Sequence, residues 1–164
     1  MSRRDQIVMS AAEADGLLEE ERTVVCATNG VRGWPHLMPL WYVLRPTGPD
    51  GATEVWAWTF AKSQKVRNLE RDPRASLQVE TGREYQELRG VLLECDVVLH
   101  RDLAMVTGIG LEVFARYTGA GAGDTPAPEV EAMVRRQAAK RAGLQFVERW
   151  LATWDHRKLA AGVY

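Results

Sequence analysis

Cysteine is scarce in this sequence, and its two copies form no recognisable motif. Cys26 and Cys95 each lie in an apolar run that is typical of a buried strand. They form neither a CxxC pair nor the ligand spacing of a zinc site. We therefore expect two buried free thiols in a reducing compartment, while a bridge between them remains compatible with the sequence.

Long hydrophobic runs are also absent. No apolar stretch approaches the ~18 residues that a membrane-spanning helix needs. The first residues, Met1 to Asp5, lead into a mixed segment that lacks the apolar core of a secretion signal. The sequence thus predicts a cytoplasmic protein with no membrane partner.

An excess of positive charge is missing as well, since 21 basic residues face 22 acidic ones and the net charge is −1. This balance argues against a nucleic-acid partner. There is also no P-loop, no nucleophile elbow and no HExxH zinc motif. Gly108-Ile109-Gly110 lacks a preceding strand and a third glycine, which argues against a Rossmann nucleotide site. We expect no metal site, because the three histidines stand in unrelated contexts.

The segment from Thr59 to Leu69 carries the strongest local signal that is present. It is typical of a strand end, a short turn and the first turn of a helix. Ser63 is placed to cap this helix, and Lys62 and Lys65 lie where the helix dipole is already positive. Each exposed cation there costs the helix about 0.3–1 kcal/mol, which a bound anion would offset. The pattern predicts a phosphate site, and a solvated basic helix end is the alternative.

Tryptophan is plentiful, and four of the six copies fall within 25 residues of one another. Tryptophan supplies a large, flat and stiff surface with a single N–H donor. Two interpretations are equally compatible with this cluster, namely a core or subunit interface and a wall for a planar ring. The six are Trp34, Trp41, Trp56, Trp58, Trp150 and Trp154.

The periodicity predicts about six strands, with helices inserted between some of them. Pro39 lacks an N–H group, so its strand is expected at a sheet edge or a bulge. The expected strands are Val24–Thr28, Pro35–Arg45, Thr53–Thr59, Arg74–Glu80, Gly90–His100 and Leu144–His156. The other expected helices begin at the Ser10–Glu13 capping box, Asp102 and Glu129, and end near Glu20, Tyr117 and Arg141. This order predicts a single, mainly β domain, a small antiparallel barrel with peripheral helices.

Three stretches together resemble a known superfamily over about residues 8 to 160. They are Val25–Thr28 with Pro35–Tyr42, then Thr59–Leu69 followed by Asp72-Pro73-Arg74, and finally Leu88–Val91 at the start of a long strand. The chain resembles the split β-barrel flavin and deazaflavin oxidoreductases, which include the pyridoxamine 5′-phosphate oxidases. The closing segment from Trp154 to Leu159 is similar to the branch that binds the deazaflavin coenzyme F420.

The resemblance implies a split β-barrel homodimer with a cofactor in a groove at each end of the interface. It implies that the cofactor phosphate meets Thr59, Ser63, Gln64 and Lys65, with Lys62 as an addition. The tricyclic ring would lie beside Pro39, Leu40 and Trp41. Arg89 would come from the other subunit, and Trp154 and Arg157 from near the last strand.

One departure from the pattern bears on the cofactor. The pyridoxamine 5′-phosphate oxidases have an arginine where this chain has Gln64, so one fixed positive charge is missing. That favours coenzyme F420, which carries a phosphodiester, over FMN with its compact dianionic phosphate. The implied function is hydride transfer between coenzyme F420 and a small organic substrate. The alternatives are an FMN-dependent oxidoreductase of the same fold and a non-catalytic protein that binds the coenzyme or a tetrapyrrole.

No catalytic residue is assigned from the sequence. In a deazaflavin or flavin enzyme the cofactor carries out the redox chemistry and the protein supplies position and electrostatics. A proton donor is still needed for many substrates. Tyr42, His36 and Tyr85 have suitable chemistry, as does water.

Overall fold

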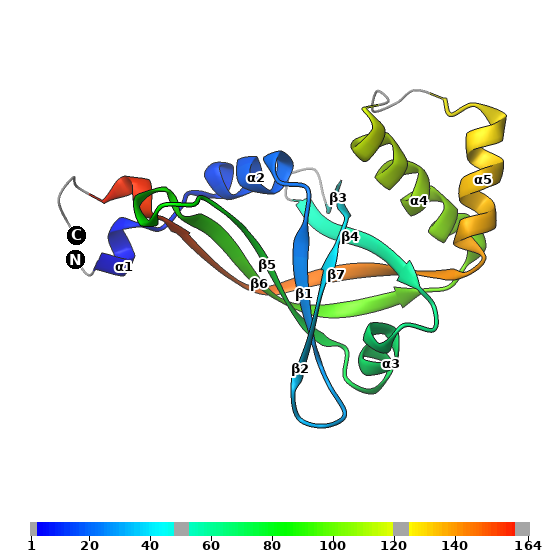
Figure 1. The fold of residues 1–164 in the computed structure, drawn as a ribbon, viewed down its shortest axis with the longest axis horizontal. Coiled ribbons are helices and arrows are strands. Elements are labelled where there is room, and N and C mark those ends of the chain that lie inside the picture. Colours follow the sequence, from blue (N-terminus) through cyan, green and yellow to red (C-terminus); the bar gives the residue numbers. More distant parts are fainter. Residues whose placement is uncertain (1–2, 48–52, 120–124, 160–164) are drawn as a thin grey trace.

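One curled antiparallel sheet forms the body of the protein (Figure 1). The computed structural model describes residues 3–47, 53–119 and 125–159. Within these ranges seven strands pair in the order β2-β1-β5-β6-β7-β4-β3. The strands are β1 (Val24–Asn29), β2 (Pro35–Leu40), β3 (Tyr42–Pro46), β4 (Thr53–Phe60), β5 (Arg74–Thr81), β6 (Arg89–His100) and β7 (Arg141–Asp155).

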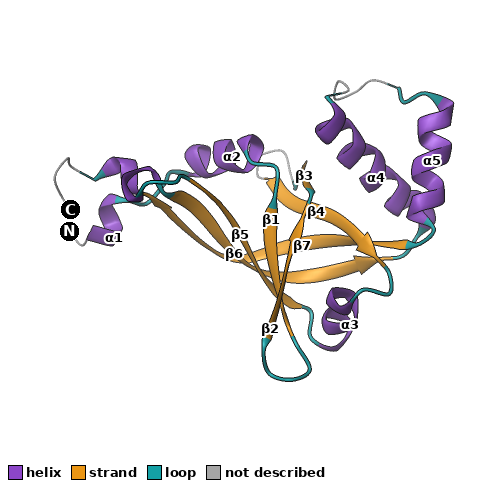
Figure 2. Ribbon diagram, viewed as in Figure 1, coloured by secondary structure: helices purple, strands orange, loops and turns teal. Residues whose placement is uncertain are grey.

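The helices surround this sheet rather than alternate with its strands (Figure 2). The short α1 and the final 3₁₀ turn lie at one end of the long β6–β7 pair, and α4 and α5 lie at the other (Figure 1). The α-helices are α1 (Arg3–Gln6), α2 (Ala11–Glu20), α3 (Gln64–Arg71), α4 (Leu103–Thr118) and α5 (Pro128–Ala138). Two 3₁₀ turns, η1 (Tyr85–Glu87) and η2 (His156–Lys158), complete the described elements. No described helix is long and apolar enough to cross a membrane.

The expected single strand from Pro35 to Arg45 is wrong, because the chain leaves the sheet at Trp41 and forms two strands. Strand β2 pairs with β1 and strand β3 pairs with β4. The side chain of Tyr117 satisfies the backbone at this break. Its Oη accepts a hydrogen bond from the N–H of Tyr42 at 2.9 Å and donates to the carbonyl of Arg22 at 2.5 Å, with the Tyr42 carbonyl at 3.2 Å. The described sheet therefore has seven strands rather than about six.

The edge position expected for Pro39 is confirmed, since β2 is the first strand in the sheet order.

Two boundaries near the end of the chain differ from expectation. Helix α5 ends at Ala138 and β7 begins at Arg141, three residues before the expected start at Leu144. The buried positions Ala142, Leu144 and Phe146 alternate along β7, so the period of the strand already applies before Leu144.

The core lies between the inner face of the sheet and α2. The expected capping box is confirmed, because Ser10 Oγ accepts from Glu13 N–H and the Glu13 carboxylate accepts from Ser10 N–H. This start directs Leu17 and Leu18 onto the sheet. The largest fully buried core side chains are Tyr42, Phe146, Leu17, Leu77 and Leu144.

A second, smaller apolar cluster joins α4 to the other face of β3 and β4. Val43 and Trp56 of the sheet pack with Ile109 and Val113 of α4, and Trp58 lies against this group. Because α5 packs on α4, the two helices stand together above β4 (Figure 1). The composition also predicts a hairpin loop over 46–51, a linker over 119–128 and a tail over 157–164, and each of these includes residues outside the described ranges.

Candidate functional site: a basic helix start beside an aromatic cavity

The predicted phosphate segment folds as a strand end, a turn and a helix start, as expected. Helix α3 begins at Gln64, and Ser63 is its N-cap, with Oγ accepting from the N–H of Val66 at 3.4 Å. The backbone N–H of Ala61 donates to the Lys140 carbonyl at 3.0 Å, which ties the turn to the start of β7. The helix start is therefore held in place by its neighbours rather than by its own cap alone.

Lys65 is the unusual cation of this segment. Its side chain is directed inward, and the residue is only 3% exposed. In the described part of the chain no carboxylate pairs with it, and its electrostatic neighbour is the thiol of Cys26. Burial lowers the pKa of Lys65 below the ordinary lysine value. A buried ammonium without a counter-ion costs stability, and a bound anion would offset that cost.

The other residues of the segment differ in exposure. Lys62 and Gln64 are exposed, whereas Thr59 is buried at the end of β4. Gln64 Nε2 donates to Asn68 Oδ1 at 2.9 Å, and Asn68 Nδ2 donates to Thr28 Oγ1 at 3.0 Å. This chain of amides links the helix start to β1. Gln64 is thereby oriented without any charged partner.

A cavity of about 430 Å³ opens beside this segment, between the sheet and the α4–α5 pair. It brings together four of the predicted cofactor residues, Pro39, Leu40, Trp41 and Thr59. Trp41 is 57% exposed and stacks on Tyr117, with ring centroids 4.4 Å apart. The volume lies in the range of small-molecule sites, about 300–1,000 Å³.

The sequence analysis missed the other half of this cavity. Helices α4 and α5 and the start of β7 supply it, and these segments lie far from β2 in the sequence. No local pattern marks such residues, because only the packing of α4 and α5 on β4 brings them to the cavity. Trp58 of β4 also lines the cavity and belongs to the tryptophan cluster already interpreted as a possible wall for a planar ring. The missed lining residues with aromatic, thioether, amide or charged groups are Phe114, Met133, Gln137 and Arg141.

Arg141 is the charged member of the missed set. Its guanidinium carbon lies 4.4 Å from the ring centroid of Trp58 and 4.5 Å from that of Phe60. The Nε atom is buried and has no hydrogen-bond partner in the described chain. Burial lowers the pKa of Arg141 below the ordinary arginine value, although a guanidinium stays protonated at neutral pH.

Arg89, Trp154 and Arg157 lie apart from the cavity within one chain. Residue Arg89 pairs with Asp155 across β6 and β7, whereas Thr59 pairs with Ala142 at the opposite end of β7. Their side chains also have partners of their own. Arg89 is 2.6 Å from the Glu20 carboxylate, and Arg157 is 2.6 Å from Asp155. The resemblance takes Arg89 from a second subunit and Trp154 and Arg157 from near the last strand, and this separation is compatible with a site completed by another subunit.

Trp154 packs directly on the backbone of the neighbouring strand. A Cβ atom built on Gly90 would lie 2.2 Å from Cζ2 of Trp154, so only glycine fits beneath the indole. Nearby, Asp155 is buried, and its hydrogen bonds from Arg157 lower the pKa of its carboxyl group. This end of β7 is therefore an ordered structure already within one chain.

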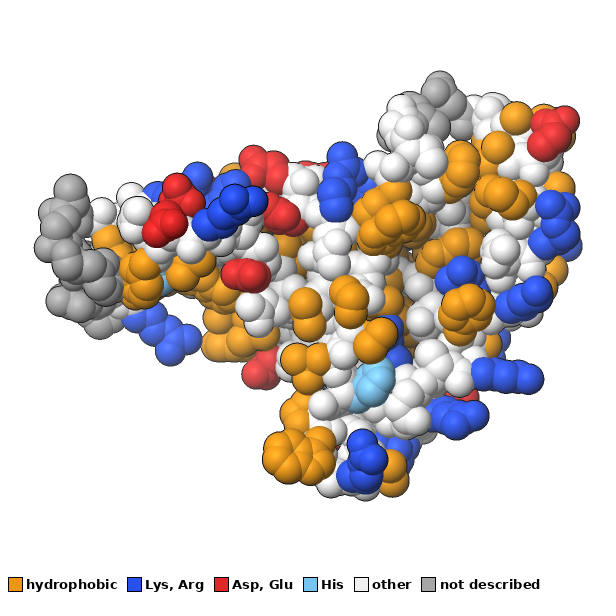
Figure 3. Space-filling view, in the orientation of Figure 1, with side chains coloured by type: hydrophobic (Ala, Val, Ile, Leu, Met, Phe, Trp, Pro, Cys, Tyr) orange, Lys and Arg blue, Asp and Glu red, His pale blue; other side chains and the backbone are white. Residues whose placement is uncertain are grey.

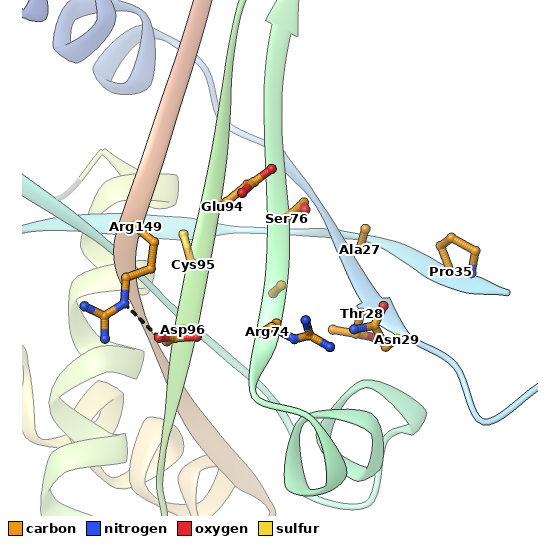
Figure 4. Close-up of a pocket in the computed structure, with 11 residues that line it drawn as sticks. Ala27, Thr28, Asn29, Pro35, Arg74, Ser76, Glu94, Cys95, Asp96 and Arg149 are labelled. Atoms are coloured by element: carbon orange, nitrogen blue, oxygen red, sulfur yellow. Dashed lines mark hydrogen bonds and ion pairs between the residues drawn. The ribbon is translucent and has the colours of Figure 1, made fainter. Parts of the chain in front are cut away.

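A second cavity of about 440 Å³ is lined by residues of β1, β2, β5, β6 and β7, on the side of α3 where Thr28 and Arg74 lie (Figure 4). Three of its charged side chains already have partners, since Arg149 pairs with Asp96 at 2.7 Å and Arg74 with Asp72 at 2.8 Å, and the exposed Glu94 adds a negative charge that would repel an anion. Cys95 also lines it, but burial raises the pKa of this thiol to about 12. Since its cations are already paired and its thiol is inert, this cavity is a weaker candidate for an anionic cofactor than the aromatic one.

Of the three chemically suitable proton donors, Tyr42 is used by the core. Its hydroxyl donates to the Leu18 carbonyl at 2.6 Å, and burial raises its pKa further above the ordinary tyrosine value. Tyr85 packs on His156 at the far end of the sheet, with ring centroids 4.4 Å apart. His36 lies on the edge strand β2, and its Nδ1 is buried without a partner in the described residues.

The surface around the site combines apolar and basic groups. In the space-filling view, several separate hydrophobic patches are visible, and Lys and Arg side chains gather toward the side of α3 and α5 (Figure 3). Exposed large apolar side chains on the edge hairpin and the cavity rim include Trp34, Leu37, Met38, Trp41, Phe60 and Met133. Such exposure in a chain of this size is typical of a surface that meets a partner or a ligand.

Comparison with protein families identifies the fold and its relatives. The family described as pyridoxamine 5′-phosphate oxidase matches residues 10–155. The chain belongs to the pyridoxamine 5′-phosphate oxidase family. Its curled seven-stranded sheet is the split β-barrel of that family, as the resemblance implied. A comparison with curated proteins finds no match.

Solved structures of this fold have diverse functions. A conserved hypothetical protein, Rv2991 from Mycobacterium tuberculosis, is 38% identical with a TM-score of 0.82, covering 99% of this chain and 98% of that one. An F420 reductase is 17% identical with a TM-score of 0.60, over 88% and 98% of the two chains. The heme storage protein HutZ from Vibrio cholerae is 14% identical with a TM-score of 0.62, over 86% and 92%. The last two show a shared fold and no more.

Proposed function

We propose that this protein is an oxidoreductase that transfers a hydride between coenzyme F420 and a small organic substrate. The observation that carries the proposal is Lys65, a buried lysine with no carboxylate partner in the described chain, at a helix start beside an aromatic cavity. A cation, free backbone N–H groups and a planar apolar wall match the phosphate and ring of a flavin-like cofactor. The F420 reductase of the same fold adds support.

The phosphate half of the proposed site lies at the start of α3. Lys65 supplies a charge, Ser63 and Thr59 supply hydroxyl groups, and Gln64 supplies an amide. Lys62 adds a second, exposed charge in the turn. The residues fit an anion, because the buried Lys65 has no counter-ion in the described chain and no acidic residue lies in the turn or the first turn of α3. A phosphodiester, which carries a single negative charge, suits one buried cation.

The ring half of the proposed site is the cavity wall formed by Pro39, Leu40 and Trp41. Pro39 lacks an N–H group, and it therefore leaves no unpaired donor facing an apolar ring. Trp41 stacks on Tyr117, which restrains its ring and makes the wall flat and stiff. A wall of this kind orients a planar group and excludes water from one of its faces.

Each complete site would contain residues from two subunits. Arg89, Trp154 and Arg157 lie too far along β7 to reach the cavity of their own chain. In a homodimer Arg89 would meet the cofactor bound by the partner subunit, as the family resemblance implies, and we extend this to Trp154 and Arg157 because they lie at the same end of the sheet. The exposed apolar residues of the edge hairpin are a suitable surface for such an interface.

When bound, the coenzyme would supply the hydride chemistry, and the protein would supply binding and orientation. Lys65 and the α3 start would anchor the phosphate, and the Trp41 wall would fix the face of the ring. The tightly bonded Tyr42 hydroxyl is unavailable as a proton donor. The proton that accompanies a hydride would then come from water or from a side chain that the substrate itself contacts.

Two alternatives rest on specific observations. Binding of FMN instead of coenzyme F420 is compatible with Lys65, but the neutral Gln64 supplies no second buried charge for a dianionic phosphate. Binding without turnover is supported by the heme storage protein of the same fold. A heme iron needs an axial ligand, and His36 is the histidine nearest the proposed site in sequence.

The test is a fluorescence titration of the purified protein with coenzyme F420 and, separately, with FMN at moderate salt. We expect micromolar or tighter binding of coenzyme F420 and weak binding of FMN. Lys65→Met should weaken coenzyme binding by about 10- to 100-fold, because a charge-assisted hydrogen bond is lost. Arg83→Met changes the net charge equally at an exposed loop position and should leave the affinity unchanged.

The outcomes separate the candidates. Preferential binding of FMN would move the protein to the FMN-dependent group. Binding of neither, or equal binding by wild type and Lys65→Met, would contradict the proposed site. Binding of coenzyme F420 without turnover of its reduced form across a panel of carbonyl, imine and activated alkene acceptors would favour the non-catalytic alternative.

A further inference from the structure

Arg141 has no polar partner in the described chain, although it lies in a mostly apolar cavity. Its guanidinium group sits 4.4 Å from the Trp58 ring centroid and 4.5 Å from that of Phe60. Its buried Nε donor has no acceptor, and no described carboxylate forms an ion pair with it. An unpaired buried donor is destabilising, so an arginine in this position lowers stability unless a ligand supplies the missing acceptor.

The aromatic contacts explain the position of the guanidinium but not its missing acceptors. Cation–π stacking uses the face of the group and leaves the N–H donors at its edge free. Those donors form a planar fork that matches a carboxylate or phosphate oxygen pair. In contrast, Arg45 also stacks on an aromatic ring, that of Trp56, yet its edge is satisfied by two hydrogen bonds to Glu112.

The rest of the cavity defines the body of the ligand. Trp41, Trp58 and Phe114 supply aromatic walls, and Met133 supplies a flexible thioether contact. Gln137 lines the same cavity and adds a neutral polar group. A planar aromatic body with one anionic group would satisfy both the walls and the arginine.

We infer that Arg141 is an anion-binding residue of this cavity and that it selects planar aromatic ligands bearing a carboxylate or a comparable anionic group. The inference rests on the proposed function in that the ligand is one held by the oxidoreductase site. The anionic group belongs either to the substrate or to the bound coenzyme, and both present the same chemistry to the guanidinium. Arg141 lies near the phosphate turn as well as in the cavity, since it pairs with Phe60 across β4 and β7.

The test compares two probes of the same shape, 2-naphthoate and 2-naphthamide, which differ in charge. Binding to the coenzyme-free dimer or monomer is followed by NMR of the tryptophan indole N–H signals. We expect 2-naphthoate to bind at least tenfold more tightly than 2-naphthamide and to shift signals that are lost in Trp41→Phe and Trp58→Phe. Arg141→Met should reduce the affinity for 2-naphthoate to that for 2-naphthamide, and Arg141→Lys should retain part of the preference.

Arg136→Met is the matched control, because it removes one exposed positive charge from the last turn of α5. It should leave both affinities unchanged. A thermal unfolding curve for each variant shows whether the fold is retained, and Arg141→Lys keeps the test informative if the methionine variant unfolds. Equal binding of the two probes to wild type, no binding of either, or an unchanged preference in Arg141→Met would overturn the inference.

A second titration identifies the source of the anion. If coenzyme F420 loses affinity in Arg141→Met and displaces 2-naphthoate from wild type, the coenzyme supplies the anionic group. If coenzyme affinity is unchanged and 2-naphthoate binds the loaded protein, the substrate supplies it. These results are independent of the Lys65→Met titration, so failure of the cofactor proposal and failure of this inference are distinguishable.

Discussion

Gly110 of α4 lies directly against the indole of Trp58 on β4. A Cβ atom built on Gly110 would lie 2.4 Å from Cζ3 of Trp58 and 2.8 Å from Cγ1 of Val134. The absence of a side chain therefore lets α4 approach the sheet while α5 packs behind it. Both Gly110 and Trp58 line the aromatic cavity, so this close contact determines the shape of the proposed ligand site.

The two glycines of α4 should respond to alanine in opposite directions. Gly110→Ala should lower the free energy of unfolding by about 1–3 kcal/mol, because the ring of Trp58 must shift. Gly108→Ala is the matched control, since its Cβ would approach only Arg45 Nη2, at 4.0 Å. That variant should be stabilised by about 0.5–1 kcal/mol through better helix propensity. Urea unfolding measures the stability change of each variant. Equal changes in Gly110→Ala and Gly108→Ala would contradict the close packing of Gly110 on Trp58.

Lys65 should lower the stability of the ligand-free protein while it strengthens the binding of coenzyme F420. Replacing it with methionine removes a buried, unpaired ammonium group, so the ligand-free protein should gain about 1–2 kcal/mol. The same variant is expected to bind coenzyme F420 more weakly. Chemical denaturation without coenzyme measures the first effect. Destabilisation of Lys65→Met would show that Lys65 has a structural partner instead.

The gain in stability of Lys65→Met over wild type should also depend on pH. The folded-state pKa of Lys65 lies below the ordinary value of 10.5, so the unfolded chain binds more protons between the two values. The stability of wild type relative to Lys65→Met therefore rises as pH increases through that window. The advantage of the methionine variant is full below the folded-state pKa and shrinks as pH approaches 10.5. A constant difference across this range would contradict the depressed pKa.

The two thiols should be inert in the folded protein. Burial raises the pKa of Cys26 to about 11 and that of Cys95 to about 12, so neither forms much thiolate at pH 8. Iodoacetamide at pH 8 should therefore leave the native protein unmodified and alkylate both residues after denaturation. Mass spectrometry counts the alkylated cysteines in each sample. Rapid modification of the native protein would indicate local opening around β1 or β6.

Trp154 provides a test of the two-subunit site. Trp154→Ala should leave the fold intact and change the absorption or emission of bound coenzyme F420, if the partner's indole lies near the ring. Trp150→Ala is a control on the same strand, four residues away, where the side chain is half exposed. An unchanged coenzyme spectrum in Trp154→Ala would assign Trp154 to packing on Gly90 alone.

The sequence by itself determined the elements whose signals are local. The Ser10 capping box, the Ser63 helix start and the edge strand with Pro39 each follow from a short pattern, and the structure confirms them. The order and spacing of three motifs along the chain were also enough to predict the family, whose model matches residues 10–155.

Only the tertiary structure decided the features that depend on distant contacts. The strand break at Trp41 depends on the hydroxyl of Tyr117, 75 positions away from Tyr42 in the chain. The burial of Lys65 and the place of Arg141 in the cavity follow from packing between α3 and β1 and between α5 and the sheet. Periodicity reports which face of an element is apolar, but it carries no information about which distant element covers that face.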